Sequence, residues 1–184
     1  MATFRRSTVP GATYFFTVNT YLRQPVLTQP LFYSALKKSV RSVMLERPFV
    51  IEAFVLLPDH LHCIWTLPDN DTDYATRWSM IKRYVSQKVR DLIEAPTSKS
   101  RQARGELGLW QRRFWEHQIR DDADMEKHVD YIHWNPVKHG YAKQVRDWPY
   151  SSFHRFVARS HYPLDWAGGS GVLAPVRAGE FAED

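Results

Sequence analysis

Two histidines and a tyrosine–asparagine pair are the residues of this sequence whose spacing could support phosphoryl chemistry. His60 and His62 alternate along a short apolar run, and side chains two residues apart in a strand project from one face of a sheet. Tyr131 and Asn135 are four residues apart in a helical pattern, so they lie one turn apart on one helix face. Two neighbouring imidazoles can hold a divalent metal ion, although an ordinary surface pair has the same spacing.

A third ligand would make such a metal site complete enough to act on a phosphate. The amide oxygen of Asn135 with two imidazoles forms a set that suits Mg²⁺, Mn²⁺ or another borderline divalent ion and leaves positions open for a substrate. Tyr131 would then lie beside the ion, which could help a hydroxyl whose pKa of about 10 otherwise makes it a poor nucleophile. With that help Tyr131 could displace a DNA 3′-oxygen and form a phosphotyrosine. The alternative is that Tyr131 simply packs at the helix edge.

The elements that must position these residues follow from hydrophobic periodicity. Alternating or continuous apolar runs predict strands, and apolar residues at helical spacing predict helices. The predicted strands are 13–21, 49–57, 60–67 and 110–119, and the predicted helices are 30–46, 74–93 and 123–134. This order predicts an α+β fold, a ferredoxin-like split βαβ arrangement with a central antiparallel sheet and helices on one face. His60 and His62 would then project from a central strand onto the opposite, open face.

We assign residues 1–184 to a single domain. The segments outside the predicted strands and helices are expected to lie around its core. Residues 1–12 form a polar, basic arm, and residues 94–108 lack any apolar period and predict a mobile loop. Pro136 is expected to end the last helix near Asn135. Residues 141–184 form a C-terminal tail with no long periodic element, apart from a short turn at 151–157.

Composition limits the class of protein. With 43% hydrophobic and 14% aromatic residues the chain of 184 residues is globular, and its formal charge of +5 with a pI near 9.4 favours a polyanionic partner without excluding an ordinary basic protein. The only cysteine, Cys63, excludes a disulfide framework and fits a reducing cytoplasm. No apolar run is long enough for a membrane span or a signal peptide. Helix 74–93 also carries four basic residues away from its apolar side: Lys82, Arg83, Lys88 and Arg90. They would either line a nucleic-acid groove or form an ordinary solvent-exposed helix face.

Four sequence blocks together resemble the REP-associated tyrosine transposases, a branch of the single-tyrosine HUH transposases of IS200-like type. The blocks occur in the family's order and cover nearly the whole chain: YFFTVN (14–19), LPDHLHCIW (57–65), RFWEH (113–117) and DYIHWNPVKHG (130–140). The resemblance implies an HUH metal site on the sheet, formed by His60 and His62, with the tyrosine helix beside it. It also implies that Tyr131 is the nucleophile and that Asn135 occupies the position of a third ligand. Many relatives have glutamine there, and the shorter asparagine leaves binding through a water molecule open.

The resemblance further implies the reaction and its partner. Single-stranded DNA would be cut and rejoined next to REP-type hairpins through a 5′-phosphotyrosine intermediate, with Mg²⁺ or Mn²⁺ as cofactor. Relatives include both monomers and homodimers, and the expected location is the cytoplasm, in association with the nucleoid. Arginine can clamp phosphates or read guanine, and tryptophan can stack on an unpaired base. The candidate DNA contacts are Arg5, Arg6, Trp110, Arg112 and Arg113.

Two other functions are compatible with the same residues. A protein that binds REP hairpins without cutting them would need only the basic surface. A metal-dependent hydrolase that uses water as its nucleophile would form no covalent adduct with DNA, but it would give Tyr131 no role.

Overall fold

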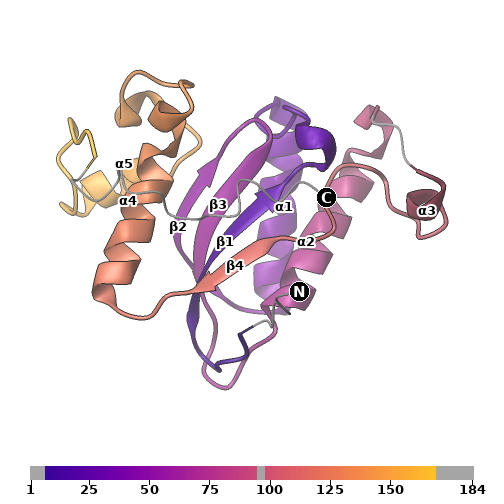
Figure 1. The fold of residues 1–184 in the computed structure, drawn as a ribbon, viewed down its shortest axis with the longest axis horizontal. Helices are drawn as coiled ribbons and strands as arrows, with labels where there is room; N and C mark the ends of the chain where they lie inside the picture. The colour runs from indigo at the N-terminus through magenta and orange to yellow at the C-terminus, as the bar shows by residue number, and fades with distance from the viewer. Residues whose placement is uncertain (1–6, 95–97, 169–184) are drawn as a thin grey trace, which may run out of the picture.

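The computed structural model describes residues 7–94 and 98–168, and Figure 1 shows their arrangement. The strands are β1 (Thr13–Asn19), β2 (Val50–Leu56), β3 (His60–Thr66) and β4 (Trp115–Gln118). The helices are α1 (Pro30–Glu46), α2 (Tyr74–Lys88), α3 (Lys99–Gln102), α4 (Asp122–Lys138) and α5 (Phe153–Ala158). Single turns of 3-10 helix span Tyr21–Arg23, Arg90–Leu92 and Val145–Asp147.

The four strands form one sheet in the order β2-β3-β1-β4, and each neighbouring pair is antiparallel. This order confirms the predicted α+β fold class with its split βαβ topology. β3 is one of the two central strands, and its register with β1 places His62 opposite Thr17 and His60 opposite Asn19. The assignment of the whole chain to a single domain stays a prediction.

The two faces of the sheet carry different cores because side chains alternate along each strand. Leu61, Cys63 and Trp65 of β3 point to the face that α1 and α2 cover, as expected from the pattern. Ile64 of β3 points to the other face, where it packs with Val129 and other residues of α4. The expectation that this second face stays open is therefore wrong, since α4 covers part of it. Figure 1 shows α4 on the opposite side of the sheet from α1 and α2.

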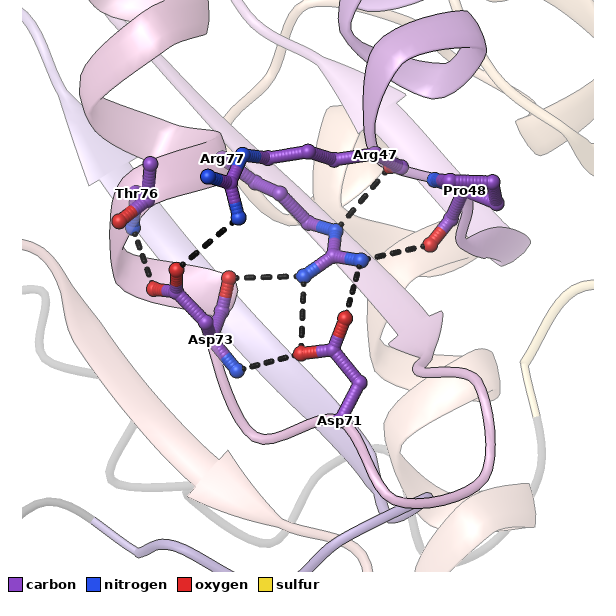
Figure 2. A network of polar contacts seen from close by, with 6 residues as sticks. All are labelled: Arg47, Pro48, Asp71, Asp73, Thr76 and Arg77. Atoms are coloured by element: carbon purple, nitrogen blue, oxygen red, sulfur yellow. Dashed lines mark hydrogen bonds and ion pairs between the residues drawn. The ribbon is translucent and has the colours of Figure 1, made fainter.

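A buried arginine joins the end of α1 to the start of α2. Arg77 is 1% exposed, and its guanidinium donates to the main-chain oxygens of Arg47, Pro48 and Asp73 (Figure 2). The same group forms an ion pair with Asp71 at 2.7 Å, which lowers the pKa of that carboxyl. A buried cation is stable only when its donors are satisfied, and here they are. The network fixes both helices on their face of the sheet.

The ends of α4 are set by one expected and one unexpected feature. The Asp121 side chain caps the N-terminus by accepting a hydrogen bond from the main-chain N–H of Asp124, as the aspartate run predicts. The helix does not end near Asn135, however, and continues through Pro136 to Lys138. Proline removes only one main-chain donor, and the buried positions of Asn135 and Pro136 hold the last turn in place.

The segments outside the sheet contain more structure than their composition predicts. Within the segment 94–108, which was predicted to be a mobile loop, Lys99–Gln102 form the short helix α3. In the tail, α5 confirms the short turn expected near 151–157, and Ser151 pairs with Val55 at the edge of β2. Within the two described ranges, every helix is too short or too polar to cross a bilayer.

Candidate functional site

His60 and His62 lie side by side on the face of the sheet that α4 covers. Both side chains are buried, and their ring centroids are 4.9 Å apart. The residue between them, Leu61, points into the opposite core under α1 and α2. The alternation predicted from the sequence is thus observed, and it brings the two imidazoles together at a central position of the sheet.

His60 is oriented by a carboxylate at the end of the β2–β3 turn. Its Nδ1 lies 2.7 Å from Asp59 Oδ1, and an ionised carboxylate can only accept, so Nδ1 carries the hydrogen and Nε2 keeps a lone pair. Arg23 forms an ion pair with the other oxygen of Asp59 at 2.9 Å. Burial raises the pKa of Asp59, but the His60 hydrogen bond and the Arg23 charge outweigh it and hold that pKa below its usual range. Burial lowers the pKa of His60, which favours the neutral ring that a metal ligand must be.

His62 is held by its neighbours on β1. Its Nδ1 lies 2.9 Å from the Thr17 hydroxyl, and its ring stacks on Phe15 with centroids 5.4 Å apart. When Nδ1–H donates to Thr17, Nε2 also keeps a lone pair. Both histidines therefore have a fixed ring orientation in which Nε2 is the atom that can bind a metal.

Helix α4 presents one face to this histidine pair. The Tyr131 ring lies 5.2 Å from the His62 ring, and the His139 ring, two turns later, lies 5.4 Å from His60. Asn135 is midway between them in the sequence, one turn after Tyr131, so it belongs to the same helix face. The structure therefore brings the Tyr131 ring to the histidine pair and places the buried Asn135 on the same helix face.

The unsatisfied polar atoms at this site fit a metal ion. Within the described residues, His60 Nε2 and both side-chain polar atoms of Asn135 are buried and have no hydrogen-bond partner. A buried polar atom without a partner costs about 1–3 kcal/mol, so several such atoms in one site call for an unseen partner. Two imidazole nitrogens and an amide oxygen form a donor set that a divalent ion can satisfy.

Sequence reasoning missed the residues that support the site. Asp59 and Arg23 orient His60, and Lys138 places its Nζ 5.0 Å from the Tyr131 ring centroid. Asp59 could have been found because it directly precedes His60, whereas nothing local connects Arg23 to a turn 36 residues later. His139 could have been found from its helical spacing with Asn135, had the helix been extended past Pro136.

A second cluster, which the sequence did not reveal, attaches the first turns of α4 to β4. His117 Nε2 lies 2.8 Å from Asp124 Oδ2, His128 Nδ1 lies 3.2 Å from Asp124 Oδ1, and these ligand-type atoms are within 4.8 Å of one another. The main-chain N–H and the guanidinium of Arg120 also donate to Asp124. Because His117 and Arg120 already donate to Asp124 Oδ2, and His128 Nδ1 lies 2.7 Å from the main-chain oxygen of Asp124, we assign the cluster to holding α4 rather than to binding a metal.

The electrostatics of this cluster predict a pH-dependent contribution to stability. Burial raises the pKa of Asp124, but hydrogen bonds from His117 and Arg120 outweigh it and lower the pKa from 3.8 to about 2. We expect Asp124→Asn to lower the free energy of unfolding at pH 7 by about 2 kcal/mol. Since the folded pKa is the lower one, the contribution is complete above pH 3.8 and is lost as the pH falls towards 2.

Urea unfolding of both proteins between pH 7 and pH 3 checks this expectation. The matched control is Asp122→Asn, which removes an exposed carboxylate from the same turn and should cost less than about 1 kcal/mol. A difference between Asp124→Asn and the unchanged chain that stays constant as the pH falls would contradict the assignment.

The candidate DNA contacts that the structure describes lie in the segment before β4. Trp110 is 7% exposed and packs in the core beside α2, so little of its ring is available for stacking. Arg112 and Arg113 are exposed, and Arg112 forms an ion pair with Glu106 at 2.7 Å. Arg5 and Arg6 lie outside the described residues.

Comparison with known proteins adds independent information about this chain. The family model described as "Transposase IS200 like" matches residues 8–135. A REP-associated tyrosine transposase of Escherichia coli K12 is 47% identical over 168 residues, covering 91% of this chain and 92% of that protein. A putative REP-associated tyrosine transposase of Haemophilus influenzae Rd is 45% identical over 172 residues, covering 91% and 94%. A solved structure of a REP-associated tyrosine transposase bound to a REP hairpin superposes with a TM-score of 0.77 at 47% identity, covering 92% and 93%.

Proposed function

This chain belongs to the IS200-like transposase family and is similar to its REP-associated tyrosine transposases, and we propose that it cuts and rejoins single-stranded DNA beside REP-type hairpins. The observation that carries the proposal is the placement of Tyr131 and Asn135 on the one face of α4 that meets His60 and His62. A candidate nucleophile and three candidate ligands would then surround the same space. The hairpin partner is proposed by analogy with the relative whose solved structure holds a REP hairpin.

In the proposed reaction Tyr131 is the nucleophile. Its hydroxyl oxygen forms a bond to phosphorus while the bond from phosphorus to the DNA 3′-oxygen breaks. The phenolic proton passes to solvent, and the departing 3′-oxygen takes up a proton. Tyr131 is left joined to the 5′-phosphate, and attack by a 3′-hydroxyl reverses the step and rejoins a strand. Lys138, next to the Tyr131 ring, supplies positive charge near the phosphate.

The residues that would hold a divalent ion are His60, His62 and Asn135. Mg²⁺ or Mn²⁺ bound there would polarise the phosphate and neutralise charge that develops on its oxygens. Asp59 and Thr17 act through the histidines, because each fixes the orientation of one imidazole. Arg5, Arg6, Trp110, Arg112 and Arg113 remain proposed contacts to the DNA.

The second candidate function is hairpin binding without cleavage. The basic surface supports it equally well, and it needs neither Tyr131 nor a metal. We further propose that the protein acts in the cytoplasm, in association with the nucleoid, as a monomer or a homodimer.

The test is a covalent-adduct assay with the full chain. A labelled single-stranded oligonucleotide carrying a REP-type hairpin is incubated with Mg²⁺ or Mn²⁺, and denaturing gel electrophoresis separates protein-linked label from free label. We expect a labelled adduct that disappears when EDTA removes the metal. Hairpin binding with no cleavage under either metal would favour the non-cleaving protein, and cleavage without an adduct would favour the hydrolase.

A further inference from the structure

A groove lies between α1 and the edge strand β2, on the face of the sheet that α1 and α2 cover. It encloses about 440 Å³, which falls in the usual range of ligand sites, roughly 300–1,000 Å³. Side chains of α1 line one side, and residues 149–152 with Arg155 of α5, which run along the edge of β2, line the other. α4 and the histidine pair belong to the opposite face of the sheet (Figure 1), so the groove is separate from the candidate catalytic site.

The groove contains apolar surface that remains accessible. Val40 and Met44 of α1 and Ile51 and Phe54 of β2 line it, and each of these side chains is only partly buried. Covering such surface with an apolar side chain removes it from water and is therefore favourable. The groove can thus hold apolar side chains of a ligand.

The charged groups of the groove all have the same sign. Its lining includes three exposed cations, Lys37, Arg41 and Arg155, and no carboxylate. Within the described residues, none of the three forms an ion pair. Arg155 donates to the main-chain oxygens of Ile51 and Glu52 from Nη2 alone, which leaves its Nη1 and Nε available for an anion. A concave surface with charges of one sign attracts groups of the opposite sign, here carboxylates.

One end of the groove is closed by two tyrosines. The rings of Tyr33 on α1 and Tyr150 in the tail meet edge to face with centroids 5.0 Å apart. The Tyr150 hydroxyl donates to the main-chain oxygen of Thr28, and the next residue, Ser151, pairs with Val55 of β2. These contacts give the wall beside β2 a defined position, so a ligand would meet a preorganised surface.

The length and the charge spacing of the groove fit an extended peptide. Its lining on α1 runs from Tyr33 to Met44, a rise of roughly 16 Å, which about five residues of an extended chain would span. Lys37 and Arg41 are about 6 Å apart along the helix axis, and carboxylates at alternate positions of an extended chain are about 6.6 Å apart. The side chains between these carboxylates point to the other side of the peptide. A small amphiphile with one charged group would match only one of the three cations.

We propose that this groove binds an acidic peptide segment of a partner protein, in which carboxylate side chains alternate with apolar ones. The carboxylates pair with Lys37, Arg41 and Arg155, and the apolar side chains pack between α1 and β2. A partner held there leaves the histidine pair on the other sheet face accessible to DNA. The inference therefore does not depend on the proposed cleavage reaction.

The test measures binding of a fluorescein-labelled peptide to the full chain by fluorescence anisotropy. The peptide alternates aspartate or glutamate with leucine or phenylalanine, and a second peptide of the same composition separates the acidic and the apolar residues into two blocks. The groove variant is Lys37→Glu with Arg41→Glu, which reverses two exposed charges of the lining. The control is Lys127→Glu with Lys143→Glu, which makes the same change in net charge at exposed positions outside the groove.

We expect the unchanged chain to bind the alternating peptide more tightly than the block peptide, with an affinity that falls as the salt concentration rises. The groove variant should lose about 10-fold or more in affinity for the alternating peptide, because two attractive ion pairs become repulsive. The control variant should lose less than about 2-fold, since exposed charges beyond a Debye length are largely screened. Urea unfolding midpoints verify that both variants are folded.

Several results would overturn the inference. They are the absence of peptide binding by the unchanged chain, equal affinities for the two peptides, and equal losses in the groove and control variants. Displacement of the peptide by an unstructured single-stranded oligonucleotide, whose own binding is lost in the groove variant, would assign the groove to DNA. A dimer of the unchanged chain in analytical ultracentrifugation that becomes a monomer in the groove variant would assign it to a second copy.

The covalent-adduct assay keeps this inference distinct from the catalytic proposal. The groove variant should form adducts with the hairpin oligonucleotide as the unchanged chain does, because its substitutions lie on the sheet face opposite to α4. Loss of adducts in a folded groove variant would mean that the groove serves the DNA reaction and would contradict the peptide assignment. Absence of adducts in the unchanged chain would count against the catalytic proposal alone.

Discussion

Replacing Tyr131 with phenylalanine should abolish covalent protein–DNA adducts while leaving hairpin binding in place. The substitution removes only the hydroxyl oxygen that would form the bond to phosphorus, and loss of a nucleophile typically costs ~10³-fold or more in rate. The ring itself keeps its contacts with His62 and Phe15, so the packing of α4 on the sheet should be retained. The measurement is the yield of labelled adduct on a denaturing gel, beside hairpin affinity from anisotropy.

The matched control is Tyr84→Phe. Tyr84 lies on α2, on the other side of the sheet from α4, and its hydroxyl donates to the exposed Glu46 carboxylate. This variant should form adducts at the rate of the unchanged chain. Adducts formed by Tyr131→Phe at a comparable rate would mean that another residue is the nucleophile.

Removing the ligand atom of His60 should cause the second large loss. His60→Ala eliminates a buried imidazole whose Nε2 is free to bind an ion, and we expect adduct formation to fall by more than ~100-fold at a fixed Mn²⁺ concentration. Asp59→Asn should cost less, about 10–100-fold, because it weakens the hydrogen bond that orients the ring without removing the ligand. Titrating the metal in each variant separates a loss of metal affinity from a loss of rate.

The control for this series is His154→Ala. His154 is exposed on α5, and its Nε2 bonds to the carbonyl oxygen of Arg146. We expect no change in metal dependence for this variant. If His60→Ala retained both full activity and the metal response of the unchanged chain, His60 would have no ligand role.

The tether at the start of α4 explains how the nucleophile keeps its place. Asp124 pairs with His117 of β4, the His128 ring stacks on the His117 ring with centroids 4.7 Å apart, and His128 lies three residues before Tyr131 on the same helix. The Phe15 ring contacts the His128, His62 and Tyr131 rings, with centroids between 4.9 and 6.0 Å apart. The position of Tyr131 over His62 is therefore fixed by ring packing together with the Asp124–His117 pair.

Local periodicity was sufficient to predict which residues share a face of an element. The bounds of α1 agree with the predicted helix at both ends, and the alternation of His60, Leu61 and His62 is observed on β3. The spacing of Tyr131 and Asn135 likewise places them on one side of α4. Which side chains share a face depends only on the number of residues per turn of a helix or on the alternation along a strand, so it can be predicted from the sequence alone.

Predictions from local periodicity were wrong where contacts with residues distant in sequence determine the local structure. The helix was expected to end before Pro136, but burial of Asn135 and Pro136 holds one further turn that brings His139 to His60. Residues 94–108 were expected to form a mobile loop without regular structure of its own, but contacts of Arg101 with Tyr21 and Glu106 accompany a helical turn at 99–102. In both cases part of the stabilisation comes from residues distant in sequence, Tyr21 in the one and the sheet under α4 in the other, so the segment's own sequence carries no sign of it.

By itself, then, the sequence determined the fold class, the histidine pair on its strand, and the tyrosine and asparagine on their helix. Only the tertiary structure decided that α4 covers the second sheet face, that Asp59 and Arg23 orient His60, and that basic residues of α1 and α5 meet in one groove. The physical reason is the range of the forces involved. Backbone geometry sets the direction of a side chain within its own element, whereas the approach of two elements depends on burial and charge contacts between residues distant in sequence.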